Sequence, residues 1–148
     1  MGIKNAIKLP KHYEALLDDL TTGDDAPFNA MYEVVIFAAA LGFHEKATRA
    51  PTPPWRTDSI AAHLFSDDTF GMLYDNIVLL SALDEEVDDP VAEVFGENVD
   101  SGFGLKIFTQ YICGGLDLID ARRSKRHTYS AVEDFSEWID DLLEELSA

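Results

Sequence analysis

The sequence has a single cysteine, Cys113, in a chain of 148 residues. One cysteine cannot build a disulfide framework or a cysteine-based zinc site within one chain. Because the residues around it are apolar and have helical spacing, Cys113 is predicted to be a buried structural thiol. The first ten residues lack the apolar core of a signal peptide, so the cytosol is the expected compartment.

The sequence also lacks the short motifs that mark common catalytic sites. It has no glycine-rich phosphate loop after a strand, no HExxH and no GxSxG. The 4 histidines are scattered, and their spacing predicts no metal site. Acidic residues are so common that no pair of them is diagnostic of acid–base catalysis. We therefore predict a protein that is not an enzyme and uses no cofactor or metal, with an unrecognised small hydrolase as the alternative.

Long apolar runs are missing too, since a membrane span needs about 20 apolar residues. The longest run is YEVVIFAAALGF, from Tyr32 to Phe43. A helix that is apolar on nearly all sides must be buried on nearly all sides. The run is therefore predicted to be the central helix of a small domain without membrane contact. Asn29 is its expected N-cap and Gly42 its expected C-cap.

Basic residues are few, with 11 against 28 acidic residues and a formal net charge of −17. Such a charge destabilises a compact chain by self-repulsion at low salt, as in halophilic proteins. Molar salt shortens the Debye length to about 3 Å and removes most of the repulsion. The composition thus predicts adaptation to a salty cytosol. The alternatives are an acidic DNA mimic, a partner for a basic protein, and an ordinary acidic domain.

The N-terminal residues alternate between polar and apolar from Asn5 to Leu9, which predicts a short strand. Pro10 then opens a helix with an apolar stripe from Tyr13 to Leu20. Together with the central helix, residues 1–45 resemble a ribbon-helix-helix unit. In such units two chains pair their strands and place them in the DNA major groove. The alternative is an ordinary edge strand with solvated lysines.

Residues 46–148 are predicted to extend this unit with about three further helices, within one mainly α domain spanning 1–148. A loop over 44–55 precedes a second short strand over 60–65, a helix that Ser66 or Asp67 caps and that ends near Leu83, and an acidic linker over 84–90. The next helix begins near Ser101 and contains Gly114 and Gly115, which indicate close packing because glycine disfavours a helix. A capping box at Ser130 starts the last helix, which ends near Leu146.

The basic residues fall into three groups that are candidates for contacts with DNA phosphates. The last group could equally complement the C-terminal dipole of the preceding helix. The candidates are Lys4, Lys8 and Lys11 in the first group, Lys46 and Arg49 in the second, which also contains Arg56, and Arg122, Arg123, Lys125 and Arg126 in the third.

Several segments between residues 7 and 120 are similar to one known family. They are Pro27-Phe28, the stretch FAAALGF that ends at Phe43, Arg49-Ala50-Pro51, and Tyr111 with Gly114-Gly115-Leu116. Together they resemble the DNA phosphorothioation-associated family known as dnd system-associated protein 4. The acidic linker and the run RRSKRH from Arg122 are not features of that resemblance.

The resemblance implies a setting in which neighbouring proteins place sulfur in the DNA backbone or act on foreign DNA that lacks it. It supplies no catalytic motif that could be transferred to this chain. The expected function is that of an accessory protein in DNA modification and antiviral defence, bound to protein partners, to double-stranded DNA or to both. The alternative is a ribbon-helix-helix-like transcriptional regulator, which would act as a homodimer. The net charge of −17 predicts that this protein alone binds DNA weakly or not at all.

Overall fold

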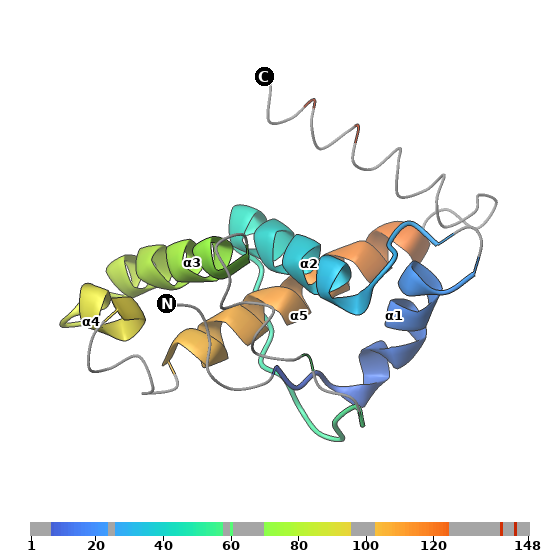
Figure 1. The fold of residues 1–148 in the computed structure, drawn as a ribbon, viewed down its shortest axis with the longest axis horizontal. Helices are drawn as coiled ribbons and strands as arrows, with labels where there is room; N and C mark the ends of the chain where they lie inside the picture. Colours follow the sequence, from blue (N-terminus) through green and yellow to red (C-terminus); the bar gives the residue numbers. More distant parts are fainter. Residues whose placement is uncertain are drawn as a thin grey trace.

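The computed structural model describes residues 7–23, 26–57, 60, 70–95, 103–124, 140 and 144. Within these ranges the chain is mainly helical, which confirms the predicted class, and it contains no strand. Figure 1 shows α2 lying across α5, with α3 and α4 towards one end of the molecule and α1 at the other. The elements are a 3-10 helix η1 (Lys11–Tyr13), α1 (Glu14–Thr21), α2 (Met31–Glu45), α3 (Phe70–Asp84), α4 (Pro90–Phe95) and α5 (Phe103–Ser124).

The predicted N-terminal strand is not found in its described residues, 7–9, and residues 5 and 6 lie outside the described ranges. Ile7 pairs with Ile60 through two backbone hydrogen bonds of 3.0 and 2.9 Å, and Pro10 forms an isolated bridge with Trp55. Proline has no N–H to donate, so the pairing cannot continue as a ladder through this position. The alternation itself was correct, because Ile7 and Leu9 are buried and Lys8 is exposed.

This correction removes the ribbon-helix-helix arrangement. Ile7 already uses its N–H and its carbonyl within the chain, and its side chain belongs to the core. In the described part of this segment, Ile7 and Leu9 therefore pair within the chain, and no ribbon strand forms. Of the second predicted strand, Ile60 makes only the bridge to Ile7, and residues 61–65 lie outside the described residues.

The first predicted helix is confirmed as η1 followed by α1. Tyr13, Leu16, Leu17 and Leu20 are all buried, as their spacing predicts. The helix ends where Thr22 becomes extended, and the Thr21 hydroxyl donates to the Leu17 carbonyl at 2.7 Å.

The central helix is α2, and its two predicted caps are wrong. Ala30, not Asn29, is the extended N-cap residue, whereas the Asn29 backbone N–H donates to Glu33 Oε1 at 3.1 Å. The C-cap is Lys46, in the left-handed conformation with φ of 56°, one turn beyond Gly42. The helix is also not buried all round, because Ala40 is exposed between buried Ala39 and Leu41.

Gly42 lies inside α2, and it packs closely against α5 there. A Cβ at this position would collide with the Tyr111 carbonyl oxygen. The two glycines of α5 meet the same seam from the other side. A Cβ on Gly114 would collide with the Ala47 carbonyl, and one on Gly115 with the Ala38 carbonyl. The close packing predicted for Gly114-Gly115 is thus confirmed, and it joins α5 to α2 and to the start of the following loop.

The remaining helices complete one side of the core. Tyr74 of α3 and Phe108 of α5 make an edge-to-face contact with ring centroids 4.9 Å apart. The acidic linker forms the turn between α3 and the short helix α4, which the sequence did not predict. Asp89 caps α4 by accepting from the Ala92 N–H at 3.1 Å. The predicted C-terminal helix lies outside the described residues, except for helical, exposed Asp140 and Glu144.

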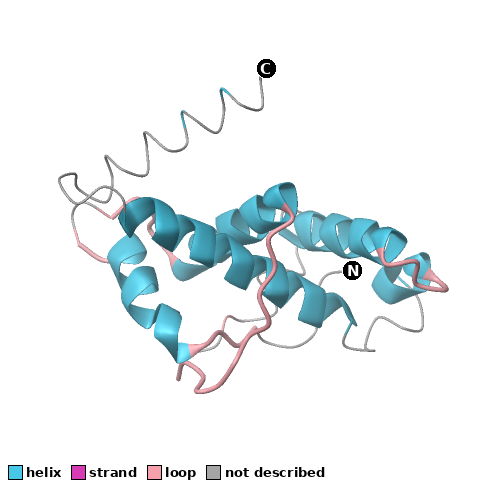
Figure 2. Ribbon diagram, turned by 180° about the vertical axis from the view of Figure 1, so that it is seen from behind, coloured by secondary structure: helices cyan, strands magenta, loops and turns pink. Residues whose placement is uncertain are grey.

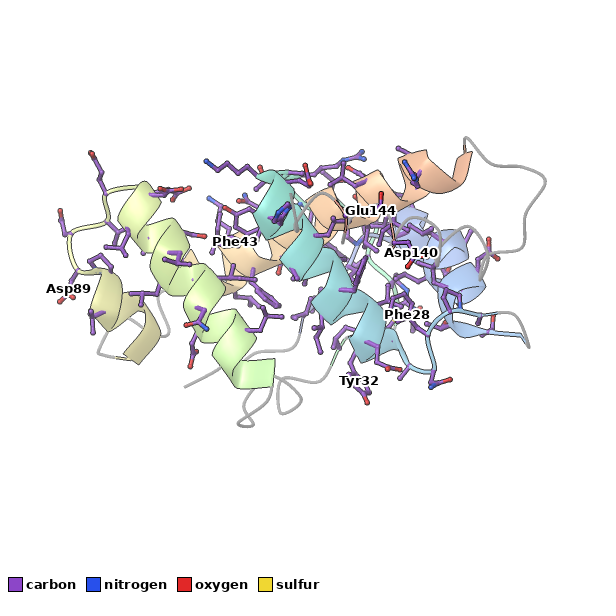
Figure 3. All side chains as sticks on the ribbon, turned by 90° about the horizontal axis from the view of Figure 1, so that it is seen from above. Phe28, Tyr32, Phe43, Asp89, Asp140 and Glu144 are labelled. Carbon is purple, nitrogen blue, oxygen red and sulfur yellow. The ribbon has the colours of Figure 1, made fainter. Side chains whose placement is uncertain are left out.

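Figure 3 views the helices from above and shows how far the acidic turn lies from the start of α2. Asp89 stands at one end of the molecule, and Phe28 and Tyr32 lie towards the other. Phe28 packs on Phe37 with ring centroids 5.9 Å apart. In the part of the chain that the structure describes, no helix has the length and apolar character to cross a membrane.

Candidate functional site

The first basic group is exposed on the N-terminal segment. Lys8 and Lys11 flank the buried Leu9 and the bridge at Pro10. Lys11 donates its backbone N–H to the Pro54 carbonyl at 2.7 Å, which fixes this segment against the end of the long loop. Lys4 lies outside the described residues.

The second basic group is divided between different tasks. Lys46 caps α2, and its backbone faces the end of that helix. Arg49 holds Asp117 of α5, with Nη1 3.1 Å from each carboxylate oxygen. Its backbone N–H also donates to the Gln110 carbonyl at 3.1 Å. The charge of Arg49 is therefore already compensated by a carboxylate of the same chain.

The third basic group begins in the last turn of α5. Arg122 is half-buried there, and Arg123 belongs to the same helix by its backbone. Lys125 and Arg126 lie outside the described residues. Figure 1 places the N-terminal segment, the start of the loop after α2 and the end of α5 in three different parts of the molecule. The described candidates thus do not gather on one basic face.

The loop over residues 46–57 links the C-terminal end of α2 to the N-terminal segment, as Figure 2 shows from behind. It starts at α2, crosses α5 and ends beside the N-terminal segment, where Arg56 donates its N–H to the Leu9 carbonyl at 2.9 Å. Through these backbone hydrogen bonds the loop holds the N-terminal segment, although it has no regular secondary structure itself.

A polar network centred on Asp117 joins η1, this loop and α5. The Tyr13 hydroxyl lies 2.8 Å from Asp117 Oδ1 and 3.2 Å from the Cys113 carbonyl oxygen, so it donates to both acceptors. Burial first, and then the hydrogen bond to Asp117, raises the pKa of Tyr13 far above its ordinary value. The Asp117 carboxylate lies between a phenol and a guanidinium, so its charge is compensated. This arrangement is typical of a structural tie between segments.

Burial also raises the pKa of the Cys113 thiol to about 11. This agrees with its predicted place in the core, where it is fully buried. A thiol that resists ionisation is a poor nucleophile.

We expect alkaline pH to destabilise the protein. The unfolded chain releases the protons of Cys113 and Tyr13 at their ordinary pKa values, whereas the folded chain retains them. Stability is therefore full below about pH 9 and falls as the pH rises, by about 1.4 kcal/mol per pH unit for each group in its window. The measurement is the free energy of unfolding in urea at several pH values in molar KCl. Tyr13→Phe should make the slope above about pH 10 shallower, and an unchanged slope would contradict this account.

A groove opens between α3, α5 and the C-terminal end of α2. It has a volume of about 370 Å³. It adjoins a smaller hollow of about 190 Å³, with which it shares Glu85, Ile107 and Gln110. The larger groove is lined by Lys46, Thr48, Ser81, Asp84, Glu85, Ile107, Gln110 and Tyr111, and the smaller hollow adds Phe103 and Lys106.

Ser81 distinguishes this groove. Its side chain is only 3% exposed, and its Oγ has no hydrogen-bond partner among the residues that the structure describes. A buried hydroxyl without a partner is unfavourable, and it is unusual in a folded protein. Sequence reasoning missed Ser81, Lys106 and Gln110 because each looks like an ordinary helical residue. Elsewhere, the described residues contain no group of three or more His, Cys, Asp or Glu side chains that could hold a metal ion.

One comparison with known proteins identifies the family. The family description for DNA sulphur modification system-associated protein 4 matches residues 6–135. The chain belongs to this family. No curated protein and no solved structure matches the chain.

The segments that resemble the DNA sulphur modification system-associated family meet in space. Gly42 of the stretch FAAALGF contacts Tyr111, and Gly114 contacts the loop just before Arg49. Arg49 in turn binds Asp117, and Phe43 packs edge-to-face on Tyr111 with ring centroids 5.4 Å apart. The resemblance therefore rests on the seam between α2, the loop and α5. These residues account for packing and leave the chemistry of the outer surface to other positions.

Proposed function

We propose that this protein is a non-enzymatic accessory protein of a DNA sulphur modification system, and that it acts through protein partners in the cytoplasm. Membership of the family supports the association with such a system. The observation that carries the proposal is that the basic charge of the family-like segments is neutralised within the chain, whose surface is acidic overall. Arg49, the cation in the family-like segments, is bound to Asp117, while the chain as a whole has a net charge of −17.

Direct contact with DNA is the weaker part of such a role. An acidic body repels a polyanion at long range, and molar salt screens that repulsion. The same salt weakens phosphate contacts, since each lowers log K by about 0.9 per unit of log salt. The segments that carry the described candidate lysines and arginines also lie in different parts of the molecule (Figure 1). We therefore assign the approach to DNA, and any role in antiviral defence, to a protein partner that carries the accessory protein with it.

The experiment is affinity purification of the tagged protein, in molar KCl, from cells that carry the modification system. The expected result is recovery of proteins of that system, with DNA recovered only when those proteins are present. Recovery should be unchanged in a Lys8→Ala/Lys11→Ala variant, which removes two exposed cations. In parallel, duplex DNA is titrated with the purified protein at low and at molar salt. Tight, sequence-selective binding that is lost in Lys4→Ala/Lys8→Ala would overturn the proposal.

A further inference from the structure

The groove between α3 and α5 contains acidic groups that have no partner within the described chain. Asp84 and Glu85 are exposed, line the groove, and make no ion pair with any residue that the structure describes. Lys46 and Lys106 stand on the groove and its adjoining hollow, and they are unpaired in the same ranges. The four side chains therefore sum to zero charge, and other features decide the sign of the site.

The C-terminal ends of two helices make the electrostatic potential of the groove negative. The groove lies at the C-terminal end of α3, which ends at Asp84, and at the C-terminal end of α2, where Lys46 is the cap. Each helix C-terminus carries the equivalent of about half a negative charge. Glu86 and Asp88 follow in the same exposed turn. A cation is thus favoured in this groove over an anion.

The walls also suit the aliphatic part of a long basic side chain. Ile107 and Tyr111 line the groove, and Phe103 lines the adjoining hollow. On α3, Leu80 is 49% exposed and lies one turn before Asp84, on the same side of the helix. Lysine and arginine bury their methylene stems on apolar surface while the charged group contacts polar atoms. Apolar surface beside carboxylates is therefore complementary to a basic segment with apolar neighbours.

Ser81 supplies the second, independent observation. Ser81 lines the groove, and its buried Oγ has no hydrogen-bond partner within the described ranges. A hydroxyl can accept a hydrogen bond from an ammonium or guanidinium group, and hydrogen bonds to charged groups are the stronger ones. A cationic side chain in the groove would satisfy this oxygen.

We propose that this groove binds a basic segment of a protein partner, with one lysine or arginine side chain placed between Asp84, Glu85 and the Ser81 hydroxyl. This inference rests on the proposed function, because it names the surface through which the accessory protein contacts its system. At molar salt only charges in contact still attract, since the Debye length is about 3 Å. A groove that brings the charges into contact therefore suits a salty cytosol better than a broad acidic face.

The direct test uses the full chain, labelled with ¹⁵N, at about 1 M KCl. It is titrated separately with the peptide acetyl-Leu-Arg-Ile-Lys-Leu-amide, with a counterpart in which glutamate replaces both basic residues, and with inorganic phosphate. The basic peptide should shift the backbone amide signals of Thr48, Ser81 and Gln110, and the other two probes should not. Shifts caused by phosphate or by the acidic peptide alone would make the groove an anion site and overturn the proposal. Absence of shifts with all three probes would overturn it too.

Variants separate local recognition from overall charge. Asp84→Asn/Glu85→Gln should weaken binding of the basic peptide about tenfold. The matched control, Glu14→Gln/Asp18→Asn on α1, removes the same charge from two residues remote from the groove in sequence and should change the affinity little. Equal weakening by both pairs would show that the groove recognises nothing beyond net charge and would overturn the proposal.

Ser81→Ala gives a result that a purely structural serine would not. Removal of an unpaired buried hydroxyl should raise the denaturation midpoint of the free protein, because no group in the described part of the chain binds the hydroxyl. The same change should weaken the basic peptide about fivefold. A variant that binds the peptide as tightly as the natural chain would overturn the placement of the cation beside Ser81.

Failure of this inference can be distinguished from failure of the proposed function. If the Asp84→Asn/Glu85→Gln variant still recovers proteins of the modification system in full, the partner docks elsewhere: the inference fails and the function stands. If the natural chain recovers none of those proteins, the proposed function fails whatever the peptide titration shows.

Discussion

Gly115→Ala should destabilise the protein by about 3 kcal/mol or more, at the upper end of what overpacking produces. In an exposed helix the same change would stabilise by about 1 kcal/mol, because alanine is the better helix former. The sign is reversed here because the new Cβ would collide with the Ala38 carbonyl of α2. A backbone oxygen cannot rotate away as a side chain can, so the two helices must separate. The measurement is the free energy of unfolding in urea, with Ala121→Gly as a control for backbone propensity at an exposed site of α5.

A second pair of variants tests this distinction between backbone and side-chain contacts. At Gly104 a Cβ would meet the hydroxyl end of the Tyr74 side chain. Gly104→Ala should therefore destabilise, and Tyr74→Phe should rescue it in part by removing the colliding atom. Gly115→Ala has no such rescue, because its obstacle is the main chain. Stability of Gly115→Ala equal to that of the natural protein would mean that α2 and α5 do not pack as closely as described.

The same seam explains why some predictions from the sequence succeeded. Helical spacing is a local property, so the buried positions Tyr13, Leu16, Leu17 and Leu20 of η1 and α1 could be read without knowledge of the partner elements. Gly114 and Gly115 were informative because two adjacent glycines inside an apolar helix have few explanations other than close approach. Cys113 lies between buried neighbours of the same helix, so its burial followed from that pattern.

The predicted C-cap of α2 was wrong because glycine can either end a helix or allow close packing inside one. Gly42 is a common kind of residue at a helix C-terminus, and here it serves instead as the contact point for Tyr111. The helix continues to Lys46, which adopts the left-handed conformation although it is not glycine. The N-terminal alternation identified the correct buried face, but a face alone does not show whether a neighbouring strand exists to complete a sheet.

The candidate site was hidden for a different reason. Tyr13 and Asp117 are separated by most of the chain, and no local pattern connects them. The groove is formed by residues from α3, α5 and the loop after α2, each of which lies on a helix side or turn of ordinary composition. Only the packing of α3 against α5 brings Ser81 and Asp84 of one helix next to Gln110 of the other. Of the family-like residues only Tyr111 lines the groove, and the contacts of these segments mainly hold α2 to α5.

The midpoint of thermal unfolding should rise by about 10 °C or more between dilute buffer and molar KCl. With 28 acidic residues against 11 basic ones, most carboxylates have no cation to pair with. In dilute salt the Debye length is about 30 Å, so carboxylates across the whole molecule repel one another. Unfolding separates them and relieves the repulsion. At molar salt the screening length is about 3 Å, and the folded state no longer bears this penalty.

Salt also weakens attractive pairs, so the direction of the effect depends on magnitudes. The exposed pair between Arg49 and Asp117 is worth at most about 1 kcal/mol. Its weakening is small beside the repulsion that is relieved among a net 17 negative charges. The variant Asp84→Asn/Glu85→Gln/Asp88→Asn tests the electrostatic origin, because it removes three exposed charges and spares Asp89, which caps α4. Its midpoint should be higher in dilute buffer and should respond less to KCl, measured by circular dichroism. An equal midpoint for the natural protein at low and molar salt would exclude adaptation to a salty cytosol.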